Sequence, residues 1–101
     1  MSIESKNRYV ICRTYSAGVF AGELVSRAAK EVVLKNARRI WYWAGAASLS
    51  ELAEKGTSKP DQCKFPCEVS RVELMEVVEI LYVSKKAAES IRSVKEWTAH
   101  E

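Results

Sequence analysis

The chain has 101 residues, 48% of them hydrophobic and 29% charged, with a net charge of +3 and a pI near 8.8. This length suits one domain with a modest core, and the composition excludes a disordered chain. No apolar run approaches the ~18 residues of a membrane span. The polar start MSIESKNR is unlike a signal peptide. We therefore expect one cytoplasmic domain over 1–101, with 1–7 and 98–101 flexible.

The first half of the chain predicts three strands. Residues 8–15 alternate between two faces, and a second strand over 19–25 follows the turn signal SAG. The third expected strand, 32–43, is long and rich in β-branched and aromatic residues. The short connections predict an antiparallel meander.

The second half predicts two helices around a further strand. Ser48 and Glu51 form a capping box for a helix over 48–55. After a Pro-containing loop we expect an extended segment at 68–70 and a buried strand at 77–83. Glutamates at every third position also allow a helix over 72–83, so that choice stays open. A capped helix over 84–97 follows.

These elements predict an α+β fold, a small bent antiparallel sheet of about four strands with two short helices. The glycine spacing adds to this expectation, because Gly18, Gly22 and Leu24 resemble the first motif of the Sm fold. The acidic residue of that motif is replaced near Arg27, and the second motif is missing. The comparison therefore implies a bent sheet without Sm-type RNA recognition.

The chemistry-bearing residues do not predict an enzyme, a metal site or a cofactor. The only histidine is His100, one residue before the C-terminal residue. Three cysteines, an odd number, indicate free thiols in a reducing compartment. Cys63 and Cys67 lack the usual CxxC spacing of a zinc site, so we expect two half-buried thiols. Walker and GxGxxG loops are missing from the sequence.

The stretch ARRIWYWAGAASLSEL at 37–52 holds the candidate binding site. Strand alternation would place Arg39, Trp41 and Trp43 on one face, close to the N-terminus of the helix capped by Ser48. Guanidinium, indole and helix N-terminus together suit a flat anionic ligand. In the alternative interpretation the tryptophans belong to the core or to an oligomer interface. The candidate ligand-binding residues are Arg39, Trp41, Trp43, Ser48, Arg38 and Arg13.

Most of the chain, about 9–95, resembles a family of small phage and prophage proteins of unknown function. The resemblance rests on a Gly-Val-x-x-Gly strand pair, then R-I-W-x-W, then G-A-x-S-L and a helix ending in Gly. The matching residues are Gly18, Val19, Gly22, Arg39, Ile40, Trp41, Trp43, Gly45, Ala46, Ser48, Leu49 and Gly56. It implies a phage accessory protein made in the bacterial cytoplasm that acts by binding.

Three functions remain open from the sequence. The leading hypothesis is a non-enzymatic phage counter-defence protein that sequesters a small anionic ligand, such as a cyclic nucleotide immune signal. The second is an inhibitor that binds a host protein through its aromatic surface. The third is a module that binds single-stranded nucleic acid by stacking. In each case the many aromatic residues of so small a domain predict a homo-oligomer.

Overall fold

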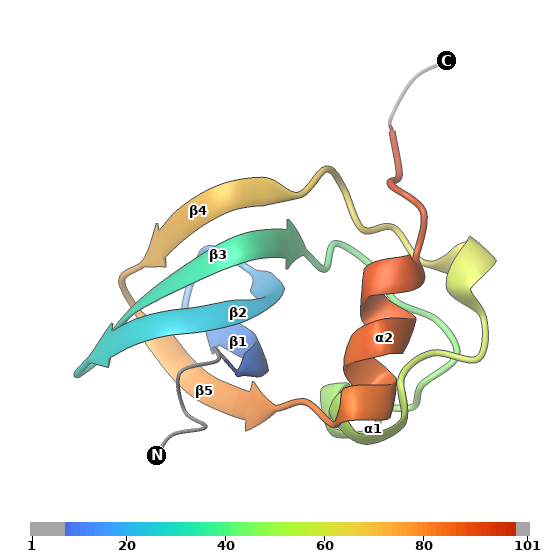
Figure 1. Cartoon of the computed structure of the whole chain (residues 1–101), viewed down its shortest axis with the longest axis horizontal. Coiled ribbons are helices and arrows are strands. Elements are labelled where there is room, and N and C mark those ends of the chain that lie inside the picture. Colours follow the sequence, from blue (N-terminus) through green and yellow to red (C-terminus); the bar gives the residue numbers. More distant parts are fainter. Residues whose placement is uncertain (1–7, 99–101) are drawn as a thin grey trace.

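The computed structural model describes residues 8–98, which form five strands, two α-helices and one short 3-10 helix (Figure 1). The termini that we expected to be flexible lie outside this range, except for Thr98. The elements are β1 (Tyr9–Thr14), β2 (Val19–Ala28), β3 (Glu31–Arg39), α1 (Leu49–Lys55), η2 (Pro60–Gln62), β4 (Val69–Leu74), β5 (Val77–Tyr82) and α2 (Lys85–Ser93).

The strands form one antiparallel sheet in the order β4-β3-β2-β1-β5. β4 and β5 are the two edges of this sheet, yet only Met75 and Glu76 separate them along the chain. So short a connection requires the sheet to curl until its edges approach each other, as Figure 1 shows. The α+β fold and the bent sheet are therefore confirmed.

The structure corrects the number and the bounds of the strands. The region 72–83 contains no helix but the end of β4, a turn and β5, because its β-branched residues outweigh the glutamate spacing. β4 is the fifth strand, where we expected only an extended segment at 68–70. β2 continues to Ala28, beyond the predicted end at residue 25, and Ala29 then turns the chain with a φ of 56°.

β3 ends at Arg39, four residues earlier than predicted. The backbone N–H of Ile40 still bonds the carbonyl of Val19, but that of Trp41 donates to Lys64 instead. Tyr42 and Lys64 form an isolated antiparallel bridge. Residues 40–48 therefore leave the sheet and run toward the loop between η2 and β4.

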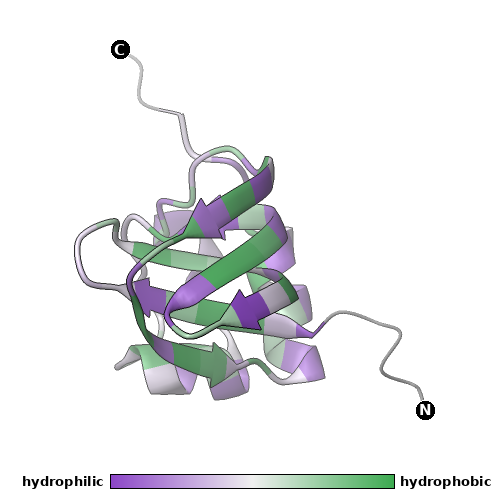
Figure 2. Ribbon diagram, turned by 90° about the vertical axis from the view of Figure 1, so that its left-hand side faces the viewer, coloured by the Kyte–Doolittle hydropathy of each residue, from purple (hydrophilic) through white to green (hydrophobic). Residues whose placement is uncertain are grey.

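Two apolar cores lie on the two faces of the sheet, and Figure 2 shows the green, hydrophobic stretches along its strands. One fills the inside of the curled sheet, and its buried members are Val10, Cys12, Phe20, Val32, Leu34, Ala37, Leu74 and Val77. The other lies between the outside of the sheet and the helices, with Tyr9, Ile11, Ala21, Ile40, Leu52, Ala53, Cys63, Phe65, Ala88, Ile91 and Val94.

Both serine caps are confirmed, but the Glu51 carboxylate accepts from the N–H of Ala47 and not from that of Ser48, so the predicted capping box forms only in part. The Ser48 hydroxyl accepts from the N–H of Glu51, and the Ser84 hydroxyl accepts from that of Ala87. α2 ends at Ser93 and not at 97, because the next residues extend along Phe65 and the N–H of Trp97 bonds its carbonyl. Between residues 8 and 98, no helix is long and apolar enough to cross a bilayer.

Candidate functional site

Arg38 is a buried structural residue. Its side chain is 5% exposed and donates to three backbone carbonyls, those of Phe65, Ile91 and Val94, at 3.0, 3.2 and 2.6 Å. Ile91 and Val94 lie at the C-terminal end of α2, where the free carbonyls and the helix dipole favour a cation. The sequence predicts a ligand contact for Arg38. In the structure its guanidinium instead donates to carbonyls of the protein itself, two of them at the end of α2.

Arg39 and Arg13 are exposed but lie on opposite faces of the sheet. The Arg39 guanidinium stacks on Phe20, 4.3 Å from the ring centroid, and donates to the carbonyl of Ala17. Arg13 faces the helix side and forms an ion pair with Glu79 at 2.9 Å. The two arginines therefore do not converge on one ligand.

Trp43 and Ser48 also have local partners. Trp43 is half-buried against the helix-side core, and its indole N–H donates to the carbonyl of Ala46. Ser48 caps α1, which has only seven residues. Because β3 ends at Arg39, that arginine, Trp41 and Trp43 do not share a strand face as predicted. The expected constellation of arginine, two tryptophans and helix N-terminus is therefore not assembled.

A different group of side chains is exposed where the chain leaves β3. Trp41 is 65% and Tyr42 is 53% exposed, so neither belongs to the core. The Lys64 ammonium lies 5.8 Å from the ring centroid of Tyr42 and 5.5 Å from that of Trp97. Backbone bonds from Trp41 and Trp97 to residues 64 and 65 hold the three segments together. We call Trp41, Tyr42, Lys64 and Trp97 the aromatic surface.

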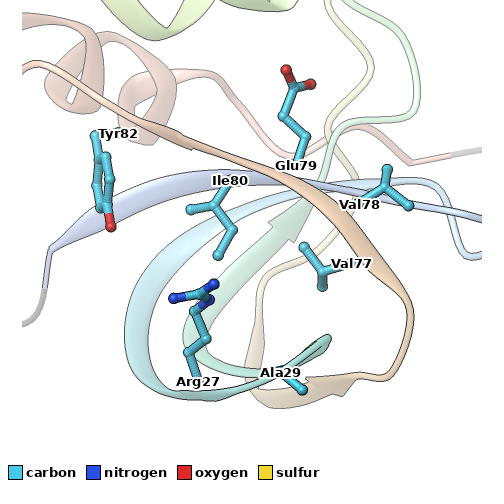
Figure 3. A pocket seen from close by; sticks show the side chains of 7 residues that line it. All are labelled: Arg27, Ala29, Val77, Val78, Glu79, Ile80 and Tyr82. Atoms are coloured by element: carbon cyan, nitrogen blue, oxygen red, sulfur yellow. The ribbon is translucent and has the colours of Figure 1, made fainter.

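The second exposed apolar region is a groove beside β5, formed by the turns at that end of the sheet. Tyr15, Met75, Val78 and Tyr82 are 80%, 66%, 52% and 54% exposed around it. One hollow of about 570 Å³ lies between Tyr15 and Met75, and a neighbouring one of about 300 Å³ lies along β5. Figure 3 shows Arg27 pointing from β2 into the smaller hollow, toward Ile80.

Two titratable groups of the described residues have strongly raised pKa values, and both lie in the cores. Burial raises the pKa of Tyr9 to about 12 and that of the Cys12 thiol to about 11, so both stay neutral inside the cores. Cys63 is buried and Cys67 is exposed, whereas we expected two half-buried thiols. Within residues 8–98, no group of three or more His, Cys, Asp or Glu side chains is placed to hold a metal ion. His100 lies outside the described residues.

From the sequence we named Trp41 as a candidate but not Tyr42, Lys64 and Trp97, which lie with it in the structure. Lys64 and Trp97 come from segments more than 20 residues away from Trp41. Two isolated β-bridges bring these segments together: Lys64 pairs with Tyr42, and Phe65 pairs with Glu96, the residue before Trp97. Their own sequence context, a Pro-rich loop and a C-terminal segment, offers no signal for a site.

Comparison with known proteins gives a family but not a function. A family model described as a domain of unknown function (DUF6948) matches residues 7–91. Searches of curated proteins and of solved structures found no match. The expected relation to a family of unknown function agrees with this result.

Proposed function

We propose that this chain, which belongs to the DUF6948 family, is a non-enzymatic binding protein for a flat anionic ligand of the nucleotide type. The ligand lies on the aromatic surface. In its biological setting the chain is phage-encoded and sequesters an immune nucleotide signal, such as a cyclic nucleotide, in the host cytoplasm. This keeps the leading hypothesis from the sequence but moves the site from Arg39 and Ser48 to Lys64 and Trp97.

One observation carries the proposal: the Lys64 ammonium lies 5.8 Å and 5.5 Å from the centroids of two aromatic rings, those of Tyr42 and Trp97. The exposed Trp41 bonds the carbonyl of Lys64 through its backbone N–H. Exposed rings provide faces for bases, and each stacked base contributes about 1–3 kcal/mol. A lysine beside them supplies the point charge that a phosphate needs. The net charge of +3 is compatible with an anionic ligand.

Calorimetric titration tests the proposal with cyclic dinucleotides, cyclic trinucleotides and cyclic ADP-ribose isomers as probes. Trp41→Ala should weaken binding about 5- to 150-fold, the equivalent of 1–3 kcal/mol. Lys64→Gln should weaken it about tenfold and reduce its salt dependence. The matched control is Tyr82→Ala. Tyr82 is 54% exposed against 65% for Trp41, and its ring also lies beside a cation, 4.7 Å from the Arg8 guanidinium, but it belongs to the groove.

The outcomes separate the open hypotheses. Equal losses for Trp41→Ala and Tyr82→Ala, or no binding of any probe, would contradict the nucleotide proposal. Single-stranded oligonucleotides form a separate arm of the titration. Binding that grows with oligonucleotide length, without binding of the cyclic nucleotides, would favour the nucleic-acid hypothesis instead.

A protein partner is the second candidate function, and the groove favours it. Four large apolar side chains exposed around neighbouring hollows are typical of a protein-binding surface. A photo-crosslinking residue at Val78 should then capture a host protein in cells, whereas the same residue at Glu89, exposed on α2, should not. Equal capture at both positions would contradict the hypothesis that the groove binds a protein partner.

A further inference from the structure

The outer edge of β4 is unpaired. Among residues 8–98, β4 bonds only β3, and its other edge lies at the margin of the sheet (Figure 1). Its side chains at Arg71 and Glu73 are exposed, and neither makes an ion pair within the described part of the chain. Free strand edges are ready templates for pairing with another chain.

The register identifies which backbone groups of β4 are free. A two-residue turn joins β2 to β3, so the flanking residues Ala28 and Glu31 bond each other. Backbone groups alternate in direction along a strand, which turns those of Val32 and Leu34 toward β4. Their partners on β4 are Leu74 and Val72. The N–H and C=O groups of Arg71 and Glu73 therefore point away from β3, toward the free edge.

We propose that β4 pairs antiparallel with β4 of a second copy of this chain, about a two-fold axis at Val72. Three neighbouring registers of the two β4 strands allow the free N–H and C=O groups of one copy to bond those of the other. Two of them place like charges opposite each other, either Arg71 against Arg71 or Glu73 against Glu73. The third places Arg71 of each copy opposite Glu73 of the other, which forms two opposite-charge pairs. Charge complementarity thus selects the third register.

The apolar side chains fit the same register. It brings Val69, 39% exposed at the start of β4, to the end of β4 of the second copy. On the other face the two Val72 side chains meet at a non-hydrogen-bonded pair, the closer of the two pair types. Dimerisation therefore covers the exposed Val69 of each copy and joins two five-stranded sheets into one.

Charge reversal tests the register, with molar mass from light scattering at micromolar to millimolar concentration as the measurement. The parent should reach twice the mass of one chain. Arg71→Glu and Glu73→Arg should each be monomeric. Each variant has side chains of the same charge at positions 71 and 73, and these two positions face each other twice across the two-fold axis. The double variant Arg71→Glu/Glu73→Arg should dimerise again. Lys86→Glu, an equal charge change on the exposed surface of α2, is the control and should leave the dimer intact.

Disulfide trapping provides an independent measurement in a Cys67→Ser background, which removes the exposed native thiol. Val72→Cys should link two copies on mild oxidation, since the paired Cα atoms are about 4.5 Å apart. Ser70→Cys should not, because the two positions are offset by four residues, roughly 13 Å. A parent that stays monomeric, a double variant that does not recover, or linking through Ser70→Cys would overturn the proposal. These measurements need no ligand, so they can fail without affecting the proposed function.

Discussion

Arg38 and Arg39 are neighbours in β3, yet their guanidinium groups lie on opposite faces of the sheet. Arg38 is buried and donates to three backbone carbonyls, two of them at the end of α2. Arg39 is exposed and stacks on Phe20 at the end of the inner core. One arginine therefore joins the helix to the sheet, whereas the other covers an apolar ring.

This difference predicts opposite results for two alanine variants. Arg38→Ala should lower the free energy of unfolding by roughly 3 kcal/mol or more, because three carbonyls of a buried site lose a charged donor. Arg39→Ala should lower it by less than ~1 kcal/mol, the usual cost of an exposed cation–π contact. Urea denaturation of both variants measures the difference. Equal losses would show that Arg38 is not the residue that fixes α2.

Alanine variants of the two tryptophans in the WYW run should likewise differ in their effect on the free energy of unfolding. Trp43 packs against the helix-side core and bonds Ala46, so Trp43→Ala should cost ~3–5 kcal/mol. Trp41 is 65% exposed, so Trp41→Ala should change the free energy of unfolding by less than ~1 kcal/mol. Thermal and urea unfolding measure both. A large loss for Trp41→Ala would place its side chain in the core and weaken the proposed aromatic surface.

Local signals predicted much of the fold. Alternating apolar residues located β1 and β2, and a serine three residues before the bonded N–H located the start of both helices. The end of β3 had no such signal, because the partner that takes the chain out of the sheet is Lys64, far along the sequence. β4 was missed because Arg71 and Glu73 give its outer face the polarity of a loop.

The candidate site was less predictable, and Arg38 shows why. A strand ending in two arginines and three aromatics fits a binding face, and alternation placed Arg38 beside the apolar Ile40. That neighbour was the one indication of burial. The carbonyls that bind Arg38 belong to Phe65, Ile91 and Val94, which no local pattern connects to β3. Tertiary contacts of this kind decide whether a charged residue contacts a ligand or fixes a helix.

Gly45 should be essential for the segment that carries the aromatic surface. Its φ is 83°, and an added Cβ would lie 2.5 Å from the backbone nitrogen of Lys59 and from the hydroxyl of Thr57. Gly45→Ala therefore combines backbone strain of about 1–3 kcal/mol with a collision against backbone that cannot rotate away. We expect a loss of several kcal/mol in urea denaturation. Ala46→Gly, at the next position, is the control and should cost less than ~1 kcal/mol.

Tyr9 should make the fold sensitive to alkaline pH. Burial raises its pKa from 10.0 to about 12, so the folded chain retains a proton that the unfolded chain releases first. Stability is therefore fully present below pH 10 and declines as the pH rises from 10 to about 12, by up to ~1.4 kcal/mol per unit. Burial also raises the pKa of Cys12, from 9.0 to about 11, which begins the decline near pH 9 in every variant that keeps this thiol.

Tyr9→Phe isolates the contribution of the phenol. The hydroxyl is buried without a hydrogen-bond partner among residues 8–98, so its removal should leave the free energy of unfolding at pH 8 unchanged or slightly higher. At pH 11 the variant should be more stable than the parent by roughly 1 kcal/mol, because only the parent has a buried phenol to ionise. Urea denaturation at both pH values measures this, with Tyr82→Phe as the exposed control, which should follow the parent. If Tyr9→Phe loses stability between pH 8 and 11 as steeply as the parent, the alkaline sensitivity belongs to Cys12 or to other groups and not to Tyr9.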